Sequence, residues 1–298
     1  MLGSLLTVLV AVAVVLTGLL ASPLLDGVER KIRAAIQSRL GPPVTQTWLD
    51  LAKLVSKEPR APPGSVYTVY MVYLTLVLSL ASLASLAVAS ILRGVAGLVL
   101  VAFTYTLAQN AAVVMPMATY NPFAFVGASR EVMLMLVNEA AMLISLAFLA
   151  LFTGSADLSA LSAVAPSPSY MIVALVVLIA SYVASARLPY DLAEAEPELA
   201  SGILIELGGP YLAMYLLSLY VRRFVAKYLA SYVVLAPLLR SPLTLASASI
   251  AMVPLLWVGY TVVSQLVGRS RVDIAPLTLF KVYTPLLLVS LILRAVGM

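Results

Sequence analysis

The sequence predicts an all-α integral membrane protein with about eight transmembrane helices and amphipathic helices in its first cytoplasmic loop. Of its 298 residues, 62% are hydrophobic and 10% are charged, and the mean hydropathy is +1.06. Soluble domains carry about 25% charged residues, so this composition indicates a chain that lies in the bilayer. Apolar runs recur along the whole chain, and we expect one polytopic membrane domain over residues 1–298.

Apolar runs of about 18 to 25 residues are long enough to cross the bilayer. They lie near residues 2–22, 67–92, 95–117, 131–153, 169–187, 209–235, 244–266 and 276–296. The first run has no basic region before it and is longer than the apolar part of a signal peptide, so we expect it to be retained as a helix. An even number of spans places both termini on the same side.

The basic residues predict the orientation of these spans. Connections on the side of the first loop contain Arg30, Lys31, Arg33, Arg39, Lys53, Lys57, Arg60, Arg130, Arg187, Arg269 and Arg271, and those on the opposite side contain Arg93, Arg240 and Arg294. Because basic residues are enriched in cytoplasmic loops, we expect the first loop to face the cytoplasm and both termini to lie outside the cell membrane. The net charge of +5 then reflects topology rather than nucleic-acid binding.

Histidine and cysteine are absent from the chain. This excludes the usual Cys and His ligands of zinc, copper, haem and iron–sulfur clusters, as well as a His-based catalytic triad. We assign no catalytic residue and no metal site. Any redox centres that work with this protein are expected on other subunits.

The longest connection, residues 24–66, is the first loop. Val28, Ile32, Ile36 and Leu40 recur every fourth position with charged residues between them, which predicts an amphipathic helix at the membrane interface. Gly41-Pro42-Pro43 is expected to end it. A second helix is predicted in "TWLDLAKLVSKEP", where Thr47 and Asp50 have the spacing of a capping box.

One carboxyl group is predicted deep in the bilayer. Glu139 lies about nine residues into the fourth predicted span, or roughly 13 Å at 1.5 Å per residue. An ionisable residue at this depth is a functional candidate by default, and a proton carrier is the role that we favour. The alternative is a structural carboxylate paired with a cation of another span. Arg222, Arg223 and Lys227 in the sixth span are open in the same way, because they either snorkel to the interface or pair with Glu139.

Acidic residues concentrate in one further cytoplasmic connection, residues 186–210. Asp191, Glu194, Glu196, Glu198 and Glu206 lie there with Arg187. Because this connection faces the same side as the basic first loop, we expect the two to line one polar, water-filled cavity. Closely spaced carboxylates also titrate as a coupled set, which suits proton transfer.

Three of these segments resemble a known family. "ERKIRAAIQSRLGPP" (29–43), "DLAKLVSKE" (50–58) and "RLPYDLAEAEPELASGILIELGGP" (187–210) are similar, in order, to signature segments of chain 1 of respiratory complex I, the NADH-quinone oxidoreductase. The resemblance covers essentially the whole chain. The same family includes the membrane subunit of energy-converting NiFe hydrogenases and formate hydrogenlyase.

Several residues favour the hydrogenase branch. "GASRE" (127–131) looks like that branch, whereas Val137 and Asn138 stand where the quinone-reducing branch carries Ser-Tyr before the glutamate. Leu219 occupies a position that is usually acidic in complex I. These departures put quinone binding in doubt and leave the coupling role intact.

The resemblance implies a subunit that docks a peripheral electron-transfer arm and couples redox chemistry to proton or sodium translocation. The implied partners are arm subunits with iron–sulfur clusters and a NiFe or quinone site, and antiporter-like membrane subunits. Matching positions are Glu29, Arg30, Lys31, Arg39, Asp50, Glu58, Arg130 and Arg187 for the interface and cavity, and Glu131, Glu139, Asp191, Glu194, Glu196 and Glu206 for the ion path.

Two alternatives from other functional classes remain. A stand-alone ion-coupled secondary transporter would also carry intramembrane charges, but the sequence shows no paired halves with broken helices. A purely structural scaffold has no need of Glu139 within a span.

Overall fold

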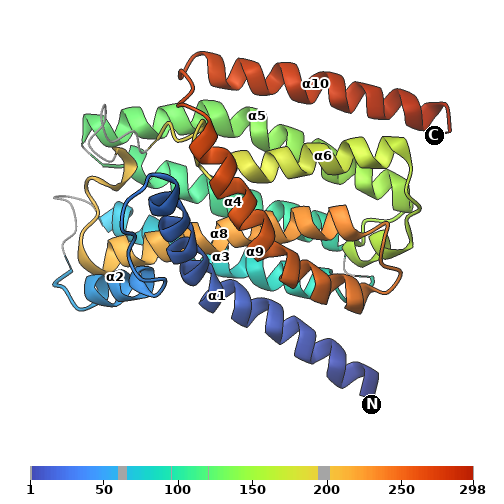
Figure 1. Cartoon of the computed structure of the whole chain (residues 1–298), viewed down its shortest axis with the longest axis horizontal. Coiled ribbons are helices and arrows are strands. Elements are labelled where there is room, and N and C mark those ends of the chain that lie inside the picture. The colour runs from blue at the N-terminus through green and yellow to red at the C-terminus, as the bar shows by residue number, and fades with distance from the viewer. Residues whose placement is uncertain (1, 60–65, 95, 120, 194–201, 298) are drawn as a thin grey trace.

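The computed structural model of the chain describes residues 2–59, 66–94, 96–119, 121–193 and 202–297, and this part contains helices and no strands. The helices are α1 (Leu2–Ile36), α2 (Gln46–Val55), α3 (Val66–Ala89), α4 (Gly97–Met117), α5 (Pro122–Thr153), α6 (Pro168–Val183), α8 (Gly209–Leu235), α9 (Pro242–Leu266) and α10 (Ile274–Ala295), with the short 3-10 helices η1 (Leu158–Ala163) and η2 (Gly202–Leu204). The long helices form one elongated bundle (Figure 1).

The two ends of the bundle differ. α2 and the second half of α1 lie at one end, to the left in Figure 1, and we call it the first-loop end. Both chain termini lie at the opposite end. A shared end for the termini is what an even number of crossings produces.

The all-α membrane fold is confirmed. Among the described residues, α3, α4, α5, α9, α10 and α1 from Thr7 are long and apolar enough to cross a membrane, and α6 is a shorter apolar helix. α8 has the length of a span, but Arg222, Arg223 and Lys227 interrupt its apolar sequence. Both α6 and α8 pack within the same bundle, so eight spans stay a prediction that this arrangement accommodates.

The first span and the amphipathic helix that we predicted after it are one continuous helix. α1 runs through Pro23 to Ile36 and changes direction about midway along its length (Figure 1). Proline removes one backbone hydrogen bond and bends a helix without always ending it. The expectation of two separate helices was therefore wrong, because the helix continues past the end of the apolar run. The bounds of the first span near residues 2–22 stay a prediction.

The fourth span shows the same effect. Its helix α5 begins at Pro122 rather than near residue 131, and the side chain of Asn121 caps it by accepting a hydrogen bond from the backbone N–H of Phe123. Proline at the first helical position and asparagine before it are favoured start signals. Glu139 therefore lies further along its helix than the apolar run predicted.

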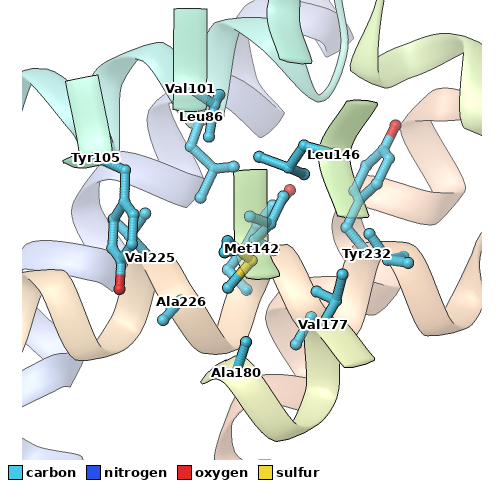
Figure 2. Close-up of a cluster of buried hydrophobic side chains, with 14 of the residues drawn as sticks. Leu86, Val101, Tyr105, Met142, Leu146, Val177, Ala180, Val225, Ala226 and Tyr232 are labelled. Carbon is cyan, nitrogen blue, oxygen red and sulfur yellow. The ribbon is translucent and has the colours of Figure 1, made fainter. Parts of the chain in front are cut away.

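α8 is the central helix of the bundle. It packs against α1, α2, α3, α4, α6 and α9, and every residue from Tyr220 to Val233 is buried. Leu86, Val101, Met142, Leu146 and Val177 from neighbouring helices pack with Val225 and Tyr232 of α8 in the apolar core (Figure 2). Because this part of α8 is enclosed on all faces, the cations on it lie inside the protein.

Gly27 allows the close approach between α1 and the first loop. A Cβ atom on this residue would lie 1.9 Å from the carbonyl oxygen of Val44. We expect Gly27→Ala to destabilise the protein by more than the about 1–3 kcal/mol typical of overpacking, because the obstacle is backbone. Gly259→Ala in α9 is the control, since nothing lies within 4 Å of its Cβ position. Monodisperse yield after detergent extraction should fall for Gly27→Ala alone, and equal yields would contradict the packing.

Candidate functional site

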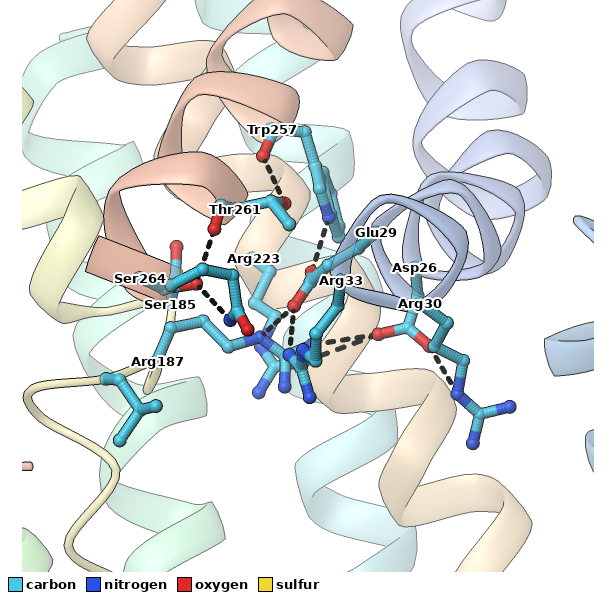
Figure 3. Close-up of polar contacts among 12 residues, drawn as sticks. Asp26, Glu29, Arg30, Arg33, Ser185, Arg187, Arg223, Trp257, Thr261 and Ser264 are labelled. Carbon is cyan, nitrogen blue, oxygen red and sulfur yellow. Dashed lines mark hydrogen bonds and ion pairs between the residues drawn. The ribbon is translucent and has the colours of Figure 1, made fainter. Parts of the chain in front are cut away.

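Ionisable side chains gather where α1 meets α8, α9 and the end of α6, and most of them are buried (Figure 3). We call this group the buried ion cluster, and its members are Asp26, Glu29, Arg33, Arg187, Arg223 and Lys227. Figure 3 shows carboxylates from α1 directed toward guanidinium groups that come from three separate parts of the chain. The cluster therefore joins α1, α8 and the connection after α6.

Glu29 holds the centre of the cluster and is 3% exposed. Its Oε1 lies 2.6 Å from Nε of Arg187 and 2.8 Å from Nη2 of Arg33. Trp257 of α9 donates its indole N–H to Oε2 at 2.9 Å. One carboxylate thus contacts two guanidinium groups and an indole. Such a buried anion is stable only while these partners stay in place.

Asp26 lies one turn earlier on the same face of α1 and is 4% exposed. It accepts hydrogen bonds from Arg187 at 2.9 Å and from the hydroxyl of Thr47 at 3.1 Å, and Nη1 of Arg223 lies 3.8 Å away. Arg187 therefore contacts both carboxylates and ties the connection after α6 to α1.

Lys227 is the deepest cation of the cluster. Its Nζ donates to the hydroxyl of Ser185 at 2.7 Å and lies 4.1 Å from the ring centroid of Trp257. The cluster as a whole places the carboxylates of Asp26 and Glu29 among four cations. Because this positive excess lies largely away from water, it is sensitive to any charge that arrives nearby.

α2 is fixed to α1 by Asp50. Arg30 donates to its Oδ2 at 2.8 Å and Gln46 donates to its Oδ1 at 2.8 Å. Partial burial alone would raise the pKa of Asp50, but the hydrogen bonds from Arg30 and Gln46 outweigh it and lower the pKa below the ordinary 3.8. The predicted capping box was wrong, because the hydroxyl of Thr47 bonds to Asp26 and the helix begins after Thr45.

The other predicted interface residues lie on the surface of the first-loop end. Lys31, Arg39 and Glu58 are exposed, and Arg39 contacts the side chain of Gln37 at 2.9 Å. Arg130 lines an open pocket of about 380 Å³ together with Arg269 and Arg271. These residues face outward, away from the buried ion cluster.

A second group of polar residues leads from the first-loop end towards the middle of the bundle. One cavity of about 30 Å³ is lined by Asp191, Glu131 and Arg222, and the next, of about 20 Å³, by Glu131 and Glu139. Glu131 and Gln109 line both cavities. A water molecule needs about 10–15 Å³, so each cavity has room for one. We call Asp191, Glu131 and Glu139 the carboxylate column.

Glu139 is the inner end of this column. Asn110 of α4 lies 3.4 Å from its Oε2, and Oε1 is buried with no hydrogen-bond partner among the described residues. Neighbouring Asn138 points elsewhere, since it donates to the carbonyl of Ala180 and accepts from Tyr283. Glu139 therefore has an oxygen free to exchange a proton with a water in the adjoining cavity.

The three cations of α8 are buried, which excludes snorkelling, and in the described part of the chain none of them pairs with Glu139. Arg222 is 5% exposed and donates to the side-chain oxygen of Gln109. Its Nε and Nη2 have no hydrogen-bond partner among the described residues. The adjacent Arg223 turns to the other side, towards Asp26. α8 thus contacts the carboxylate column through Arg222 and the buried ion cluster through Arg223.

The acidic residues of the connection after α6 lie in different places. Asp191 belongs to the carboxylate column and pairs with Arg269 at 3.1 Å. Glu206 accepts a hydrogen bond from Asn121 at 2.6 Å, beside the start of α5. Glu194, Glu196 and Glu198 lie outside the described residues.

Sequence reasoning missed Asp26, Gln109, Asn110 and Trp257. Asp26 lies three residues before Glu29, so helical spacing alone places both on one face. Gln109 and Asn110 are amides within an otherwise apolar run, which is a comparable signal. Nothing in the local sequence pointed to Trp257, because its hydrogen bond to Glu29 joins residues that are 228 positions apart.

Comparison with known proteins places this arrangement in a family. The profile of the NADH dehydrogenase family matches residues 7–295. The chain is 31% identical to hydrogenase-4 component C of Escherichia coli (strain K12), over 71% of this chain and 70% of that protein. It is 30% identical to formate hydrogenlyase subunit 4 of the same organism, over 63% of this chain and 64% of that one.

Two further likenesses span nearly the full length. An H subunit of NADH-quinone oxidoreductase from Rhodopseudomonas palustris (strain BisB5) is 26% identical over 99% of this chain and 98% of its own. A chain of the membrane-bound sulfane sulfur reductase, an archaeal respiratory membrane complex, has the same fold with a TM-score of 0.78 over 96% of this chain and 98% of that chain, at 18% identity. The chain therefore belongs to the NADH dehydrogenase family, that of complex I subunit 1.

Proposed function

We propose that this protein is the membrane-arm subunit of a complex I-like redox complex of the hydrogenase type. In this proposal its first-loop end faces the cytoplasm and docks a peripheral electron-transfer module, and its carboxylate column couples electron transfer to ion translocation. Both termini lie outside the cell membrane. The family membership and the position of the relatives in multi-subunit complexes support this role.

The observation that carries the proposal is the position of α8 between two sites. A negative charge that arrives at the first-loop end is attracted to the positive excess of the buried ion cluster. A shift of Arg223 towards or away from Asp26 is transmitted along α8 to Arg222, which borders the cavities of the carboxylate column. Movement of this cation changes the electrostatic cost of holding a proton on Glu131 and Glu139.

Asn110 indicates where the ion path leaves the subunit. It is exposed on α4 beside Glu139, and an uncovered amide is expensive against lipid. A neighbouring membrane subunit, of the antiporter-like kind that the family resemblance implies, would cover it. The moved charge then passes from Glu139 to that subunit.

The hydrogenase branch is favoured by sequence identity, since hydrogenase-4 component C and formate hydrogenlyase subunit 4 match at 31% and 30%, against 23% to 28% for six H subunits of NADH-quinone oxidoreductase. The nearly full-length match to one of these H subunits keeps quinone reduction as the second candidate. Partner subunits supply the iron–sulfur clusters in either case and a NiFe site in the first.

The test is to purify the tagged protein from its native membrane in mild detergent and to measure nickel, iron and flavin that co-purify. Iron with nickel is expected. Iron without nickel would shift the proposal to the quinone-reducing branch. Iron-free, partner-free protein that transports ions alone in liposomes would replace the whole proposal by a secondary transporter.

The docking surface is tested by charge reversal in the same assay. Lys31→Glu with Arg39→Glu is expected to lower the co-purifying iron several-fold, because both side chains are exposed on the predicted docking side. Arg240→Glu is the control, since Arg240 is exposed but lies at the other end of the bundle, before α9. Equal iron in both variants would contradict docking at the first loop.

A further inference from the structure

An open pocket lies at the end of the bundle that carries the termini, far from the two sites described above. Its volume is about 540 Å³, and its polar lining is Arg93, Arg294, Thr153, Ser155, Asp157 and Ser167. We call it the outer pocket. The connection between α3 and α4, the connection between α5 and α6, and the last turn of α10 form it together.

The placement of its arginines goes against the charge bias of the chain. By the orientation that the basic residues predict, Arg93, Arg240 and Arg294 are the basic residues of the outer connections. Two of these three line the same pocket. Basic residues are disfavoured on the outer side, so their convergence needs a reason other than orientation.

The arginines of the outer pocket are not neutralised by its acid. The carboxylate of Asp157 accepts hydrogen bonds from the backbone N–H groups of Gly94 at 2.8 Å and Ala96 at 3.1 Å. Arg294 lies over the ring of Phe152 at 5.1 Å, and Arg93 is exposed. Neither arginine forms an ion pair within the described residues.

Apolar side chains also line and flank the outer pocket, and Phe152 and Val164 are among its lining residues. Leu92 and Leu151 directly precede lining residues and Val296 lies two positions after Arg294; these three are 46%, 61% and 68% exposed. α10 ends at Ala295, and the end of a spanning helix lies at the level of the lipid headgroups. Guanidinium groups with apolar surface beside them at this level match a phosphate with attached acyl chains.

We propose that the outer pocket binds the phosphate of an anionic phospholipid of the outer leaflet. Arg93 and Arg294 donate to the phosphate oxygens, which guanidinium groups bind with paired N–H donors. Ser155 and Ser167, which line the same pocket, border the remaining headgroup, and the acyl chains lie along Leu151 and Val296. Basic pockets between transmembrane helices bind anionic headgroups on the cytoplasmic side of membranes, and the same pairing of charge is proposed here on the outer side. This site is independent of the proposed redox role.

The experiment is native mass spectrometry on the purified, delipidated protein with its partners. Phosphatidylglycerol, phosphatidylcholine and inorganic phosphate are the probes. We expect retention of phosphatidylglycerol over phosphatidylcholine by wild type, and a loss of at least about tenfold in Arg93→Gln with Arg294→Gln, since charged hydrogen bonds are lost. Arg240→Gln is the matched control and should bind as wild type does.

Two further arms keep the result decisive. Arg93→Lys retains the charge but loses the paired donors, so intermediate retention by this exposed-site variant is expected even if the double variant folds poorly. Equal retention by wild type, the double variant and Arg93→Lys would overturn the site. Displacement of phosphatidylglycerol by an equal concentration of inorganic phosphate would contradict the proposal of a lipid ligand and show that the pocket binds free anions instead.

Discussion

Glu139→Gln is expected to assemble and to transfer electrons while losing most of its ion translocation. Glutamine has the volume of glutamate and keeps the contact with Asn110, but it cannot take up or release a proton. Because Glu139 is the inner end of the carboxylate column, we expect the ions moved per electron to fall at least about tenfold. Inside-out vesicles with a pH-sensitive dye and a parallel assay of electron transfer measure both quantities.

Two controls sharpen this result. Glu139→Asp retains an ionisable group and should keep part of the translocation. Glu58→Gln removes an exposed carboxylate of the first loop, and the complexes that assemble with it should move as many ions per electron as wild type. If Glu139→Gln moved as many ions per electron as wild type, the column would not be the ion path.

Glu29→Gln is expected to destabilise the protein itself. The change leaves Arg33 and Arg187 without their closest counter-charge in a buried site, and breaking a buried ion pair costs about 3–5 kcal/mol. The nearby positive charges of Arg223 and Lys227 add to the repulsion. We expect little monodisperse protein in detergent and a midpoint of thermal unfolding well below that of wild type.

Lys31→Gln is the matched control for this change. It removes one charge from the same helix two residues away, but its side chain is exposed, so its stability should stay within about 0.5 kcal/mol of wild type. Equal thermal stability of Glu29→Gln and Lys31→Gln would show that the buried ion cluster does not hold α1 against α8.

Much of the fold and family could be predicted because hydropathy and loop motifs carry that information. The all-α membrane fold followed from apolar runs alone. The boundaries of α1 and α5 did not, because an apolar run records the thickness of the bilayer while helices continue beyond it. The two prolines also have different effects: Pro23 lies inside α1, where the helix bends, whereas Pro122 is the first residue of α5. The residue type alone does not distinguish these two roles.

The sequence identified several residues of the candidate site, but it did not show which of them contact one another. Glu29, Arg187, Glu131 and Glu139 were singled out from the sequence, but the partner of Glu29 on α9 is far away in the chain. Arg222 and Arg223 were left between snorkelling and pairing with Glu139, and the structure shows neither. Adjacent residues on a helix point about 100° apart, so Arg222 and Arg223 were bound to face different neighbours. Which groups lie on each side depends on the packing of the helices, which the sequence does not show.

In the proposed coupling, α8 carries a charge signal from the buried ion cluster to the carboxylate column. Arg222→Gln tests this most directly, because the change removes the cation that borders the cavities while Arg223 and its contact with Asp26 remain. The measurement is the number of ions moved per electron by the reconstituted complex. The proposal predicts an assembled complex that transfers electrons with a strongly reduced ratio, whereas an unchanged ratio would contradict coupling through α8.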